Sequence, residues 1–282
     1  MAKILWLASY PKSGNTWLRV FLANYGEAGP LPVNINRLPE VSFSDARARY
    51  YAQAAGPAAG TLAEADINRL RPAVHRLLAM ARPGLVPVKT HAAIAVVDGV
   101  PTISAEVTHA AIYIVRNPLD VACSFAHHYG LTVANAVRAI SFAGLKTLPR
   151  ADEVAQLLSD WSSHARSWLT AAGLMLHVVR YEDMIAQPHA TFGDIVTFLG
   201  WPKDRARLQR ALRKSDFRIL AEQERTGGFV EAPRRGGRFF RSGRVGGWRE
   251  ELTEEDARFI VDRHREMMRR FRYLGEDDKI LV

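Results

Sequence analysis

The chain has 282 residues, of which 48% are hydrophobic, and it carries a formal net charge of +9 at pH 7. This length suits one large domain with a substantial core, and no apolar run approaches the roughly 18 residues of a membrane-spanning helix. The single cysteine, Cys123, excludes an intrachain disulfide and indicates a reducing, cytoplasmic environment. The apolar stretch at residues 4–8 is too short for a signal peptide and is interpreted as a buried strand.

Short apolar stretches alternate with helical patterns along the chain. We expect strands at residues 4–9, 85–89, 110–115 and 174–180, and helices at 16–24, 118–126, 153–171, 191–199, 205–212 and 254–271. Residues 42–82 are expected to be helical with a break near Gly56, and residues 26–39 form a loop; Asp66 is a candidate helix cap. This order predicts a single α/β domain over residues 1–282, with a central parallel sheet flanked by helices.

The positive charge is concentrated in one part of the chain. Residues 205–249 contain thirteen Arg or Lys and four Asp or Glu, a surplus of nine that accounts for the whole net charge. Such a segment indicates either a polyanionic partner (nucleic acid, a membrane surface or a charged nucleotide) or a solvated basic surface. Within it, residues 225–247 are rich in Gly and Arg without periodicity and predict a mobile or disordered loop.

The segment YPKSGNTW follows the first expected strand and opens the first expected helix. It lacks the G-x-x-x-x-G-K-[ST] spacing of a Walker A loop. Backbone amides at the helix start nevertheless attract an anion, to which Lys12 adds a charge and Thr16 a hydroxyl, while Trp17 offers a flat apolar face. The alternative is an ordinary turn with a surface lysine.

The segment RNPLDVACS has the same strand-to-helix position. Arg116 at the strand end can form a bidentate pair with a phosphate, and Ser124 lies about two helical turns further on. Pro118 and Asp120 are typical of a helix start. The alternative is an ion pair between Arg116 and Asp120.

Two further segments carry candidate chemistry. VKTH places His91 just past an expected strand, and imidazole is the side chain best suited to accept a proton near neutral pH. RSGRVGGWR combines arginines with glycines that let backbone amides approach a phosphate, although a flexible basic loop would have the same composition. His127 and His128 are adjacent rather than at i, i+4, so no metal site is expected, and they are interpreted as either acceptor-cleft or surface residues.

Together, YPKSGNTW, VKTH, RNPLDVACS, RYEDM and RSGRVGGW resemble, in this order, the cytosolic-type sulfotransferases. These enzymes have a P-loop-like nucleotide-binding fold and transfer a sulfuryl group from 3′-phosphoadenosine 5′-phosphosulfate (PAPS) to a hydroxyl or amine. The product nucleotide is adenosine 3′,5′-bisphosphate (PAP), and no metal is needed. The N-terminal segment is similar to small bacterial members, including those that sulfate glycopeptide antibiotics.

The resemblance implies roles for individual residues. Lys12 stabilises the leaving 5′-phosphate, His91 is the base that takes the acceptor's proton, and Lys89 assists at the sulfuryl group; Ser124 completes the catalytic set. The implied nucleotide site has three parts. Its 5′-phosphosulfate loop comprises Lys12, Ser13, Gly14, Asn15, Thr16 and Trp17, with Trp17 stacked on adenine. Its 3′-phosphate site comprises Arg116, Ser124, Arg241, Ser242 and Gly243, and further adenine contacts come from Tyr181, Ser215 and Phe217.

The chain also departs from the family pattern. Ser242 stands where the family often has lysine, so Arg244 or Arg238 would have to supply the missing charge. GGWR replaces the usual GDWK, and the C-terminal dimer motif of animal members is not intact around residues 249–258. We therefore expect a monomer, or a dimer formed by another surface.

The sequence thus predicts sulfuryl transfer from PAPS to a small-molecule or natural-product acceptor, with a phenol, an alcohol or a glycopeptide as candidate classes. Loops at residues 26–82, 125–150 and 225–240 are expected to line or cover the acceptor cleft. The alternatives are a P-loop-like nucleotide kinase and a basic nucleic-acid-binding protein. Neither nucleic acid nor a membrane is the expected partner.

Overall fold

The computed structural model describes residues 3–27, 29–57, 62–233 and 237–282. The chain divides into two compact units, each assembled from three stretches. The first unit comprises Met1–Tyr10, Ser42–Tyr113 and Phe142–Val178, and the second comprises Pro11–Val41, Ile114–Ser141 and Val179–Val282. Neither unit is contiguous in sequence, and the single domain expected over residues 1–282 stays a prediction.

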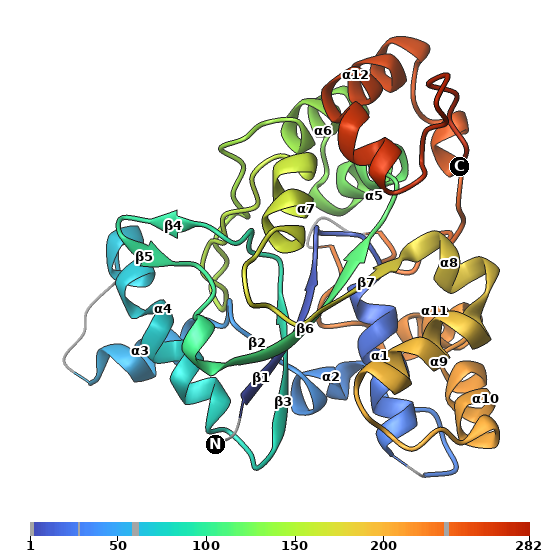
Figure 1. Ribbon diagram of the computed structural model, residues 1–282. Helices are drawn as coiled ribbons and strands as arrows, with labels where there is room; N and C mark the ends of the chain where they lie inside the picture. The colour runs from blue at the N-terminus through green and yellow to red at the C-terminus, as the bar shows by residue number, and fades with distance from the viewer. Residues whose placement is uncertain (1–2, 28, 58–61, 234–236) are drawn as a thin grey trace. The chain divides into compact units, whose positions relative to one another are not determined.

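A five-stranded sheet has the order β2-β3-β1-β6-β7 (Figure 1). Its strands are β1 (Lys3–Ser9), β2 (Phe43–Ser44), β3 (Leu85–Thr90), β6 (Thr108–Val115) and β7 (Leu176–Arg180). β3 pairs in parallel with both β1 and β2, and every residue of β1 after Lys3 is buried. A strand buried on both faces needs an uninterrupted apolar run, which is why the N-terminal stretch predicts it so well. The predicted α/β fold with a central parallel sheet is confirmed.

The first unit contains helices α3 (Ala48–Ala55), α4 (Glu64–Ala79) and α7 (Trp161–Leu169) and the short helix η2 (Ala105–Val107). α4 packs against α3 and against β1 and β3. A two-stranded hairpin, β4 (Val96–Val97) and β5 (Val100–Pro101), turns at Asp98 and Gly99, which both have positive φ as a tight hairpin turn requires.

Two predictions for this unit are wrong in detail. The helix expected at residues 153–171 begins only at Trp161, because the amide of Val154 donates to the carbonyl of Ala46 in a neighbouring stretch and Asp160 caps the helix start by accepting from Ser163 N at 2.8 Å. Asp66 is not the cap of α4 but lies in its first turn, where its carboxylate accepts from Ala63 N.

The second unit is largely helical. It contains α1 (Asn15–Gly26), η1 (Ile35–Arg37), α2 (Leu38–Val41), α5 (Pro118–Tyr129), α6 (Val133–Ile140), α8 (Tyr181–Ala186), α9 (Pro188–Phe198), α10 (Arg205–Lys214), α11 (Phe217–Gly227), η3 (Gly247–Glu250) and α12 (Glu254–Arg270). The sequence did not predict α6, α8 or α11, and η1 and α2 interrupt the loop expected at 26–39. Among the described residues, no helix is both long and apolar enough to span a membrane.

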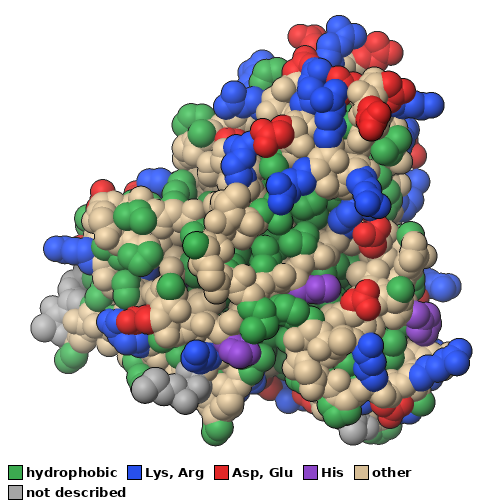
Figure 2. Space-filling view, in the orientation of Figure 1, with side chains coloured by type: hydrophobic (Ala, Val, Ile, Leu, Met, Phe, Trp, Pro, Cys, Tyr) green, Lys and Arg blue, Asp and Glu red, His purple; other side chains and the backbone are tan. Residues whose placement is uncertain are grey.

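The last helix shows how the charges of this unit are distributed. The side chain of Thr253 caps α12 by accepting from Asp256 N at 3.1 Å, and acidic residues occupy the first turn while Arg269 and Arg270 occupy the last. This order complements the helix dipole. Basic and acidic side chains lie beside one another over α12, at the top of Figure 2. The surface here is mixed in charge.

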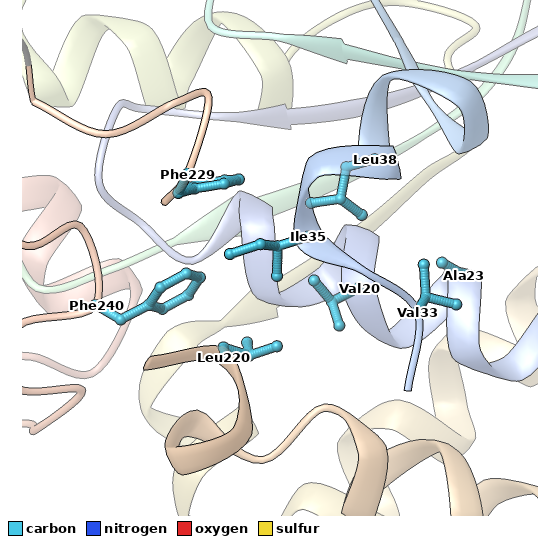
Figure 3. Packing of buried hydrophobic residues seen from close by; sticks show 8 residues of the cluster. All are labelled: Val20, Ala23, Val33, Ile35, Leu38, Leu220, Phe229 and Phe240. Carbon is cyan, nitrogen blue, oxygen red and sulfur yellow. The ribbon is translucent and has the colours of Figure 1, made fainter. Parts of the chain in front are cut away.

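A hydrophobic cluster joins distant parts of the second unit (Figure 3). Its buried members come from α1, from the segment that contains η1, from the start of α2, from α11 and from the Gly/Arg-rich segment: Val20, Ala23, Val33, Ile35, Leu38, Leu220, Phe229 and Phe240. Phe229 and Phe240 are 8% exposed each, so two positions of the Gly/Arg-rich segment are packed into the core. Residues 234–236, within the loop expected to be mobile, lie outside the described residues.

A buried polar network supports the end of β3. The fully buried Asp45 accepts from Thr90 Oγ1 at 2.9 Å and from Gln156 Nε2 at 2.8 Å. Thr90 in turn accepts from the amide of Ala92 at 3.1 Å, so the network fixes the backbone where β3 passes into the loop that begins at His91. Burial raises the pKa of the Asp45 carboxyl from its ordinary 3.8 to about 6, with Arg71 opposing the effect.

This pKa makes a prediction about stability. The folded protein holds the Asp45 proton more tightly than the unfolded chain, so the stabilisation is complete below the unfolded pKa and is lost as pH rises through about 6. Asp45→Asn removes this titration. The difference in unfolding free energy between variant and wild type should move in the variant's favour by about 2 kcal/mol between about pH 4.5 and about pH 7.5. Urea unfolding at both pH values measures it, and parallel pH curves would contradict the assignment.

Candidate active site

The loop between β1 and α1 has the backbone of an anion-binding turn. Lys12 has φ of 69° and Gly14 has φ of 105°, both in the left-handed region. Gly14 is the N-cap of α1 and makes no side-chain cap, so the first amides of the helix are not satisfied by a capping oxygen. Ser13 is fully buried, and its hydroxyl has no hydrogen-bond partner among the described residues. The loop therefore presents donors suited to an anion.

Aromatic side chains pack against this loop. A methyl group at Gly14 would lie 2.7 Å from Tyr181 Cδ2, so only glycine allows the tyrosine ring so close. Trp17 meets Tyr181 and Phe192 edge-on, with ring centroids 6.1 and 5.3 Å away. Its indole nitrogen is buried without a hydrogen-bond partner among the described residues. Trp17 and Tyr181, both expected at the adenine, are thus in contact with each other.

Arg116 links the separate loops of the second unit. Its Nη1 donates to the carbonyl of Lys12 at 3.1 Å and its Nη2 donates to the carbonyl of Arg244 at 3.1 Å. Its guanidinium also lies over the ring of Tyr181, 4.4 Å from the centroid, and Tyr181 donates to the carbonyl of Gly243 at 3.3 Å. The structure therefore brings the Lys12 loop, Arg116, Tyr181 and the loop of residues 241–244 to one place.

The Lys12 ammonium has two further neighbours that the sequence did not assign to it. Its Nζ lies 3.7 Å from the centroid of the Phe239 ring and 3.5 Å from Nδ1 of His128. The ammonium can only donate, so Nδ1 is the acceptor in the contact with His128. His128 is half-buried and lies beside Lys12, and its assignment to the acceptor cleft or to the surface stays a prediction.

Carboxylates hold the loop of residues 241–248. The two oxygens of Asp120 accept from the amides of Gly246 at 2.9 Å and Trp248 at 3.1 Å. Arg241 is exposed and its Nη2 donates to Glu251 at 2.7 Å, while His127 contacts the other oxygen of Glu251 at 2.8 Å. Asp120 therefore fixes the glycine-rich backbone around Gly246.

A third carboxylate, that of Glu224, holds the Gly/Arg-rich segment at Phe239 and Phe240. Glu224 in α11 accepts from the amides of Phe239 at 2.6 Å and Phe240 at 2.9 Å. Arg19, which is 2% exposed, also pairs with Glu231 at 2.7 Å. The described parts of residues 225–247 are thus attached at several points, and the expected mobility stays a prediction.

The remaining candidates of the nucleotide site differ in accessibility. Ser124 is half-buried on α5, and Ser242 is half-buried in its loop. Ser215 is fully buried, with its hydroxyl donating to Ala211 O at 2.8 Å and accepting from Asn24 at 3.2 Å, so it is engaged within the fold. Phe217 lies against Gly243. Asn15 and Thr16 are buried in the first turn of α1.

His91 and Lys89 lie in the first unit, and both are half-buried. Nδ1 of His91 is 2.8 Å from the carbonyl oxygen of Ser9, the last residue of β1. A carbonyl oxygen can only accept, so Nδ1 carries the hydrogen and the basic lone pair of the neutral ring is on Nε2. The ring is thereby held in one tautomer, the form that a proton acceptor needs at Nε2.

Strands β1, β3 and β6 of one α/β sheet lead into the loops that carry Lys12, His91 and Arg116. Ligands of open α/β sheets bind at the carboxyl ends of the strands. The family description "Sulfotransferase domain" matches residues 3–272. The chain belongs to the sulfotransferase family, and the expectation of an enzyme of this family is confirmed.

Solved structures show the same fold. A mouse sulfotransferase, SULT7A1, complexed with PAP is 20% identical with a TM-score of 0.62, over 95% of this chain and 84% of that one. Retinol dehydratase with androsterone and PAP is 18% identical with a TM-score of 0.65, over 94% and 80%. The same enzyme with retinol and PAP has a TM-score of 0.64 at 18% identity, over 95% and 81%. No curated protein matches the sequence at a significant level.

The residues that sequence reasoning missed are those that hold the motifs. Asp120 was part of a quoted motif, but only as a helix-start residue and a possible ion-pair partner of Arg116. Phe239, Glu224 and Glu251 belong to no motif, and their contacts with the site lie at separations along the chain where no periodic pattern applies. The signal available in the sequence was an acidic residue within the basic segment of residues 205–249, as at Glu224.

Gly243 offers a test of this geometry. It has φ of 61°, and a methyl group there would lie 2.6 Å from Phe217 Cδ2. Gly200 has φ of 66° with nothing within 4 Å, so Gly200→Ala measures backbone strain alone, about 1–2 kcal/mol. Gly243→Ala should cost about 1–3 kcal/mol more, because Phe217 must move. Urea unfolding of both variants decides it, and equal losses would mean that Phe217 does not constrain this loop.

Proposed function

We propose that the protein transfers the sulfuryl group of PAPS to an acceptor hydroxyl. The observation that carries the proposal is the position of Arg116, whose guanidinium donates to the carbonyls of both Lys12 and Arg244 over the ring of Tyr181. A nucleotide with phosphates at both the 5′ and the 3′ position requires two cationic loops at a fixed separation. The relatives crystallised with PAP support this nucleotide.

In this proposal the Lys12 loop binds the 5′-phosphosulfate. The amides at the start of α1 and the Lys12 ammonium stabilise the negative charge that develops on the 5′-phosphate as it leaves. Arg116, Ser124 and Arg241 bind the 3′-phosphate, for which Arg241 would exchange its contact with Glu251. Trp17 and Tyr181 provide apolar surface for the adenine. Arg244, two residues from Ser242 in the sequence, is proposed to supply the charge of the lysine that Ser242 replaces. Its guanidinium pairs with Glu250 at 3.3 Å.

The transfer is an in-line displacement. The acceptor oxygen attacks sulfur, a new oxygen–sulfur bond forms while the bond from sulfur to the 5′-phosphate oxygen breaks, and the acceptor's proton passes to Nε2 of His91. PAP leaves with the electron pair. Lys89 is proposed to assist at the sulfuryl group.

The acceptor is proposed to be a small molecule or natural product: a phenol, an alcohol or a glycopeptide. Retinol dehydratase was crystallised with androsterone and with retinol, which supports an acceptor of small-molecule size. Phe239 and His128 beside Lys12 are candidates to contact it. A panel of phenols, aliphatic alcohols and glycopeptides, tested with PAPS, identifies the class.

A cytoplasmic location and a bacterial source stay predictions. Cys123 is buried, and burial raises the pKa of its thiol to about 12, so the thiol remains protonated near neutral pH. This agrees with a structural rather than a redox role for the cysteine. Membrane and nucleic-acid partners are not proposed. The protein is proposed to be a monomer, or a dimer formed by a surface other than the C-terminal dimer motif of animal members.

The base and the charge stabiliser are separable by mutation. His91→Ala should lower turnover about 10²-fold or more while PAP affinity stays unchanged, because the ring acts on the acceptor's proton. Lys12→Ala should lower both turnover and affinity, since the ammonium contacts the nucleotide throughout. His109→Ala, at an exposed histidine of β6, is the control and should keep full activity. Full activity of His91→Ala at pH 7 would exclude His91 as the base.

Nucleotide discrimination tests the 3′-phosphate site. ADP can occupy the Lys12 loop but leaves the 3′ site empty, whereas PAP fills both. Charge-assisted contacts contribute about 1.5–3 kcal/mol each, so two of them predict a preference for PAP of about 10²- to 10⁴-fold. Arg116→Ala should remove most of this preference and leave weak ADP binding nearly unchanged. Calorimetry with PAP, ADP and ATP measures it.

Arg207 provides a matched control. Like Arg116, it donates to two backbone carbonyls, those of Tyr25 and Gly26, and lies over a tyrosine ring at 4.8 Å. Arg207→Ala should retain the PAP preference. Equal affinity of the wild type for PAP and ADP would overturn the 3′-phosphate assignment, and tightest binding of ATP would favour a kinase.

A further inference from the structure

Helix α7 holds the loop that begins at His91. His164, Ser167 and Trp168 occupy positions i, i+3 and i+4, which share one face of a helix. Nε2 of His164 lies 3.1 Å from the carbonyl of His91, Nε1 of Trp168 donates to the carbonyl of Ala92 at 3.1 Å, and Ser167 Oγ accepts from the amide of Ile94 at 2.9 Å. One face of α7 thus binds the backbone of three of the four loop residues 91–94, namely His91, Ala92 and Ile94.

The fourth residue of the loop is fixed by the segment that precedes the helix. The amide of Ala93 donates to the carbonyl of Leu157 at 2.8 Å. Every residue from 91 to 94 therefore has a backbone hydrogen bond to the stretch at 157–168. The position of His91 is set by this stretch as well as by the sheet.

Of the three α7 residues that bind the loop, His164 is the one that contacts His91, the candidate base. It is fully buried, with Nδ1 2.9 Å from the hydroxyl of Tyr113. Because the carbonyl of His91 can only accept, Nε2 of His164 carries the hydrogen, and its Nδ1 accepts from Tyr113. Burial also lowers the pKa of His164 to about 4, so the ring is neutral near neutral pH. Tyr113 thereby fixes the tautomer in which His164 can bind the His91 backbone.

His91 is consequently held at two points. Its ring donates from Nδ1 to the carbonyl of Ser9, and its own carbonyl accepts from His164. The first contact sets the tautomer, and the second fixes the peptide from which the ring projects. A displacement of about 1 Å in a reacting group can cost about 10² in rate. The second contact thus bears on the placement of Nε2 as much as the first.

We propose that His164 is a positioning residue for the transfer reaction, which acts through the backbone of His91 to place its Nε2 against the acceptor's proton. The inference rests on the proposed role of His91 as the base. It assigns a function to a fully buried histidine that is not among the residues proposed to contact the nucleotide or the acceptor.

The test compares two substitutions of His164 with a control. His164→Leu removes the donor and should lower kcat about 10- to 100-fold with PAP affinity and the KM for PAPS unchanged. His164→Gln offers both an N–H donor and a carbonyl acceptor and should restore most of the lost turnover. His264→Leu removes a second buried histidine, which contacts Ser141 at 3.2 Å in the second unit, and should lose stability but not kcat.

A double-mutant cycle separates this inference from the proposed function. If His164 acts through His91, then His164→Leu has no further effect on kcat in the His91→Ala background. An inactive His91→Ala protein together with a fully active His164→Leu protein would overturn the inference and leave the base assignment standing. A fully active His91→Ala protein would overturn the proposed role of His91 itself.

A spectroscopic measurement tests the effect of His164 on the His91 ring without measuring enzyme activity. In ¹⁵N-labelled protein, the ring of His91 should show hydrogen on Nδ1 alone in the wild type and in His164→Gln. In His164→Leu it should show averaging between the two tautomers as the peptide loses its anchor. An unchanged His91 tautomer signal and unchanged kcat in His164→Leu would overturn the proposal, as would equal losses of kcat in His164→Leu and His264→Leu.

Discussion

The contact on which the second unit depends is that of Arg116 with two backbone carbonyls. A guanidinium offers five donors in a rigid plane, so it can bind two carbonyls and still stack on Tyr181. Lysine could satisfy only part of this geometry. By joining the Lys12 loop to the loop of residues 241–244, Arg116 sets the separation of the two proposed phosphate sites. In the proposed function the same residue also binds the 3′-phosphate.

The loops around Arg116 are held by buried or half-buried carboxylates. Asp120 takes two amides near Gly246, and Glu224 takes two amides near Phe239. A carboxylate that accepts from two backbone amides fixes an irregular segment without regular secondary structure. This explains how a stretch so rich in Gly and Arg can present Phe239 to Lys12.

The basic segment is less available to polyanions than its composition indicates. Arg225 pairs with Glu222 at 2.6 Å, Arg241 with Glu251 at 2.7 Å and Arg244 with Glu250 at 3.3 Å. Exposed pairs of this kind stabilise the fold little, but they neutralise charge locally. Mixed charges also lie over α12 (Figure 2). The proposed nucleotide would replace one carboxylate, that of Glu251, at Arg241.

The sequence by itself determined the fold class, strands β1, β3, β6 and β7, most long helices and the motif residues, because buried strands leave apolar runs and amphipathic helices leave periodic patterns. It did not determine β2 (Phe43–Ser44), which lies within the residues expected to be helical. It placed Lys12, His91 and Arg116 at strand ends correctly. It did not determine that Asp120 binds the amides near Gly246, that Phe239 covers Lys12 or that His164 binds the carbonyl of His91, 73 residues away. Only the tertiary structure decided these contacts, because a hydrogen bond between distant stretches depends on how the chain packs and leaves no pattern in the neighbouring residues.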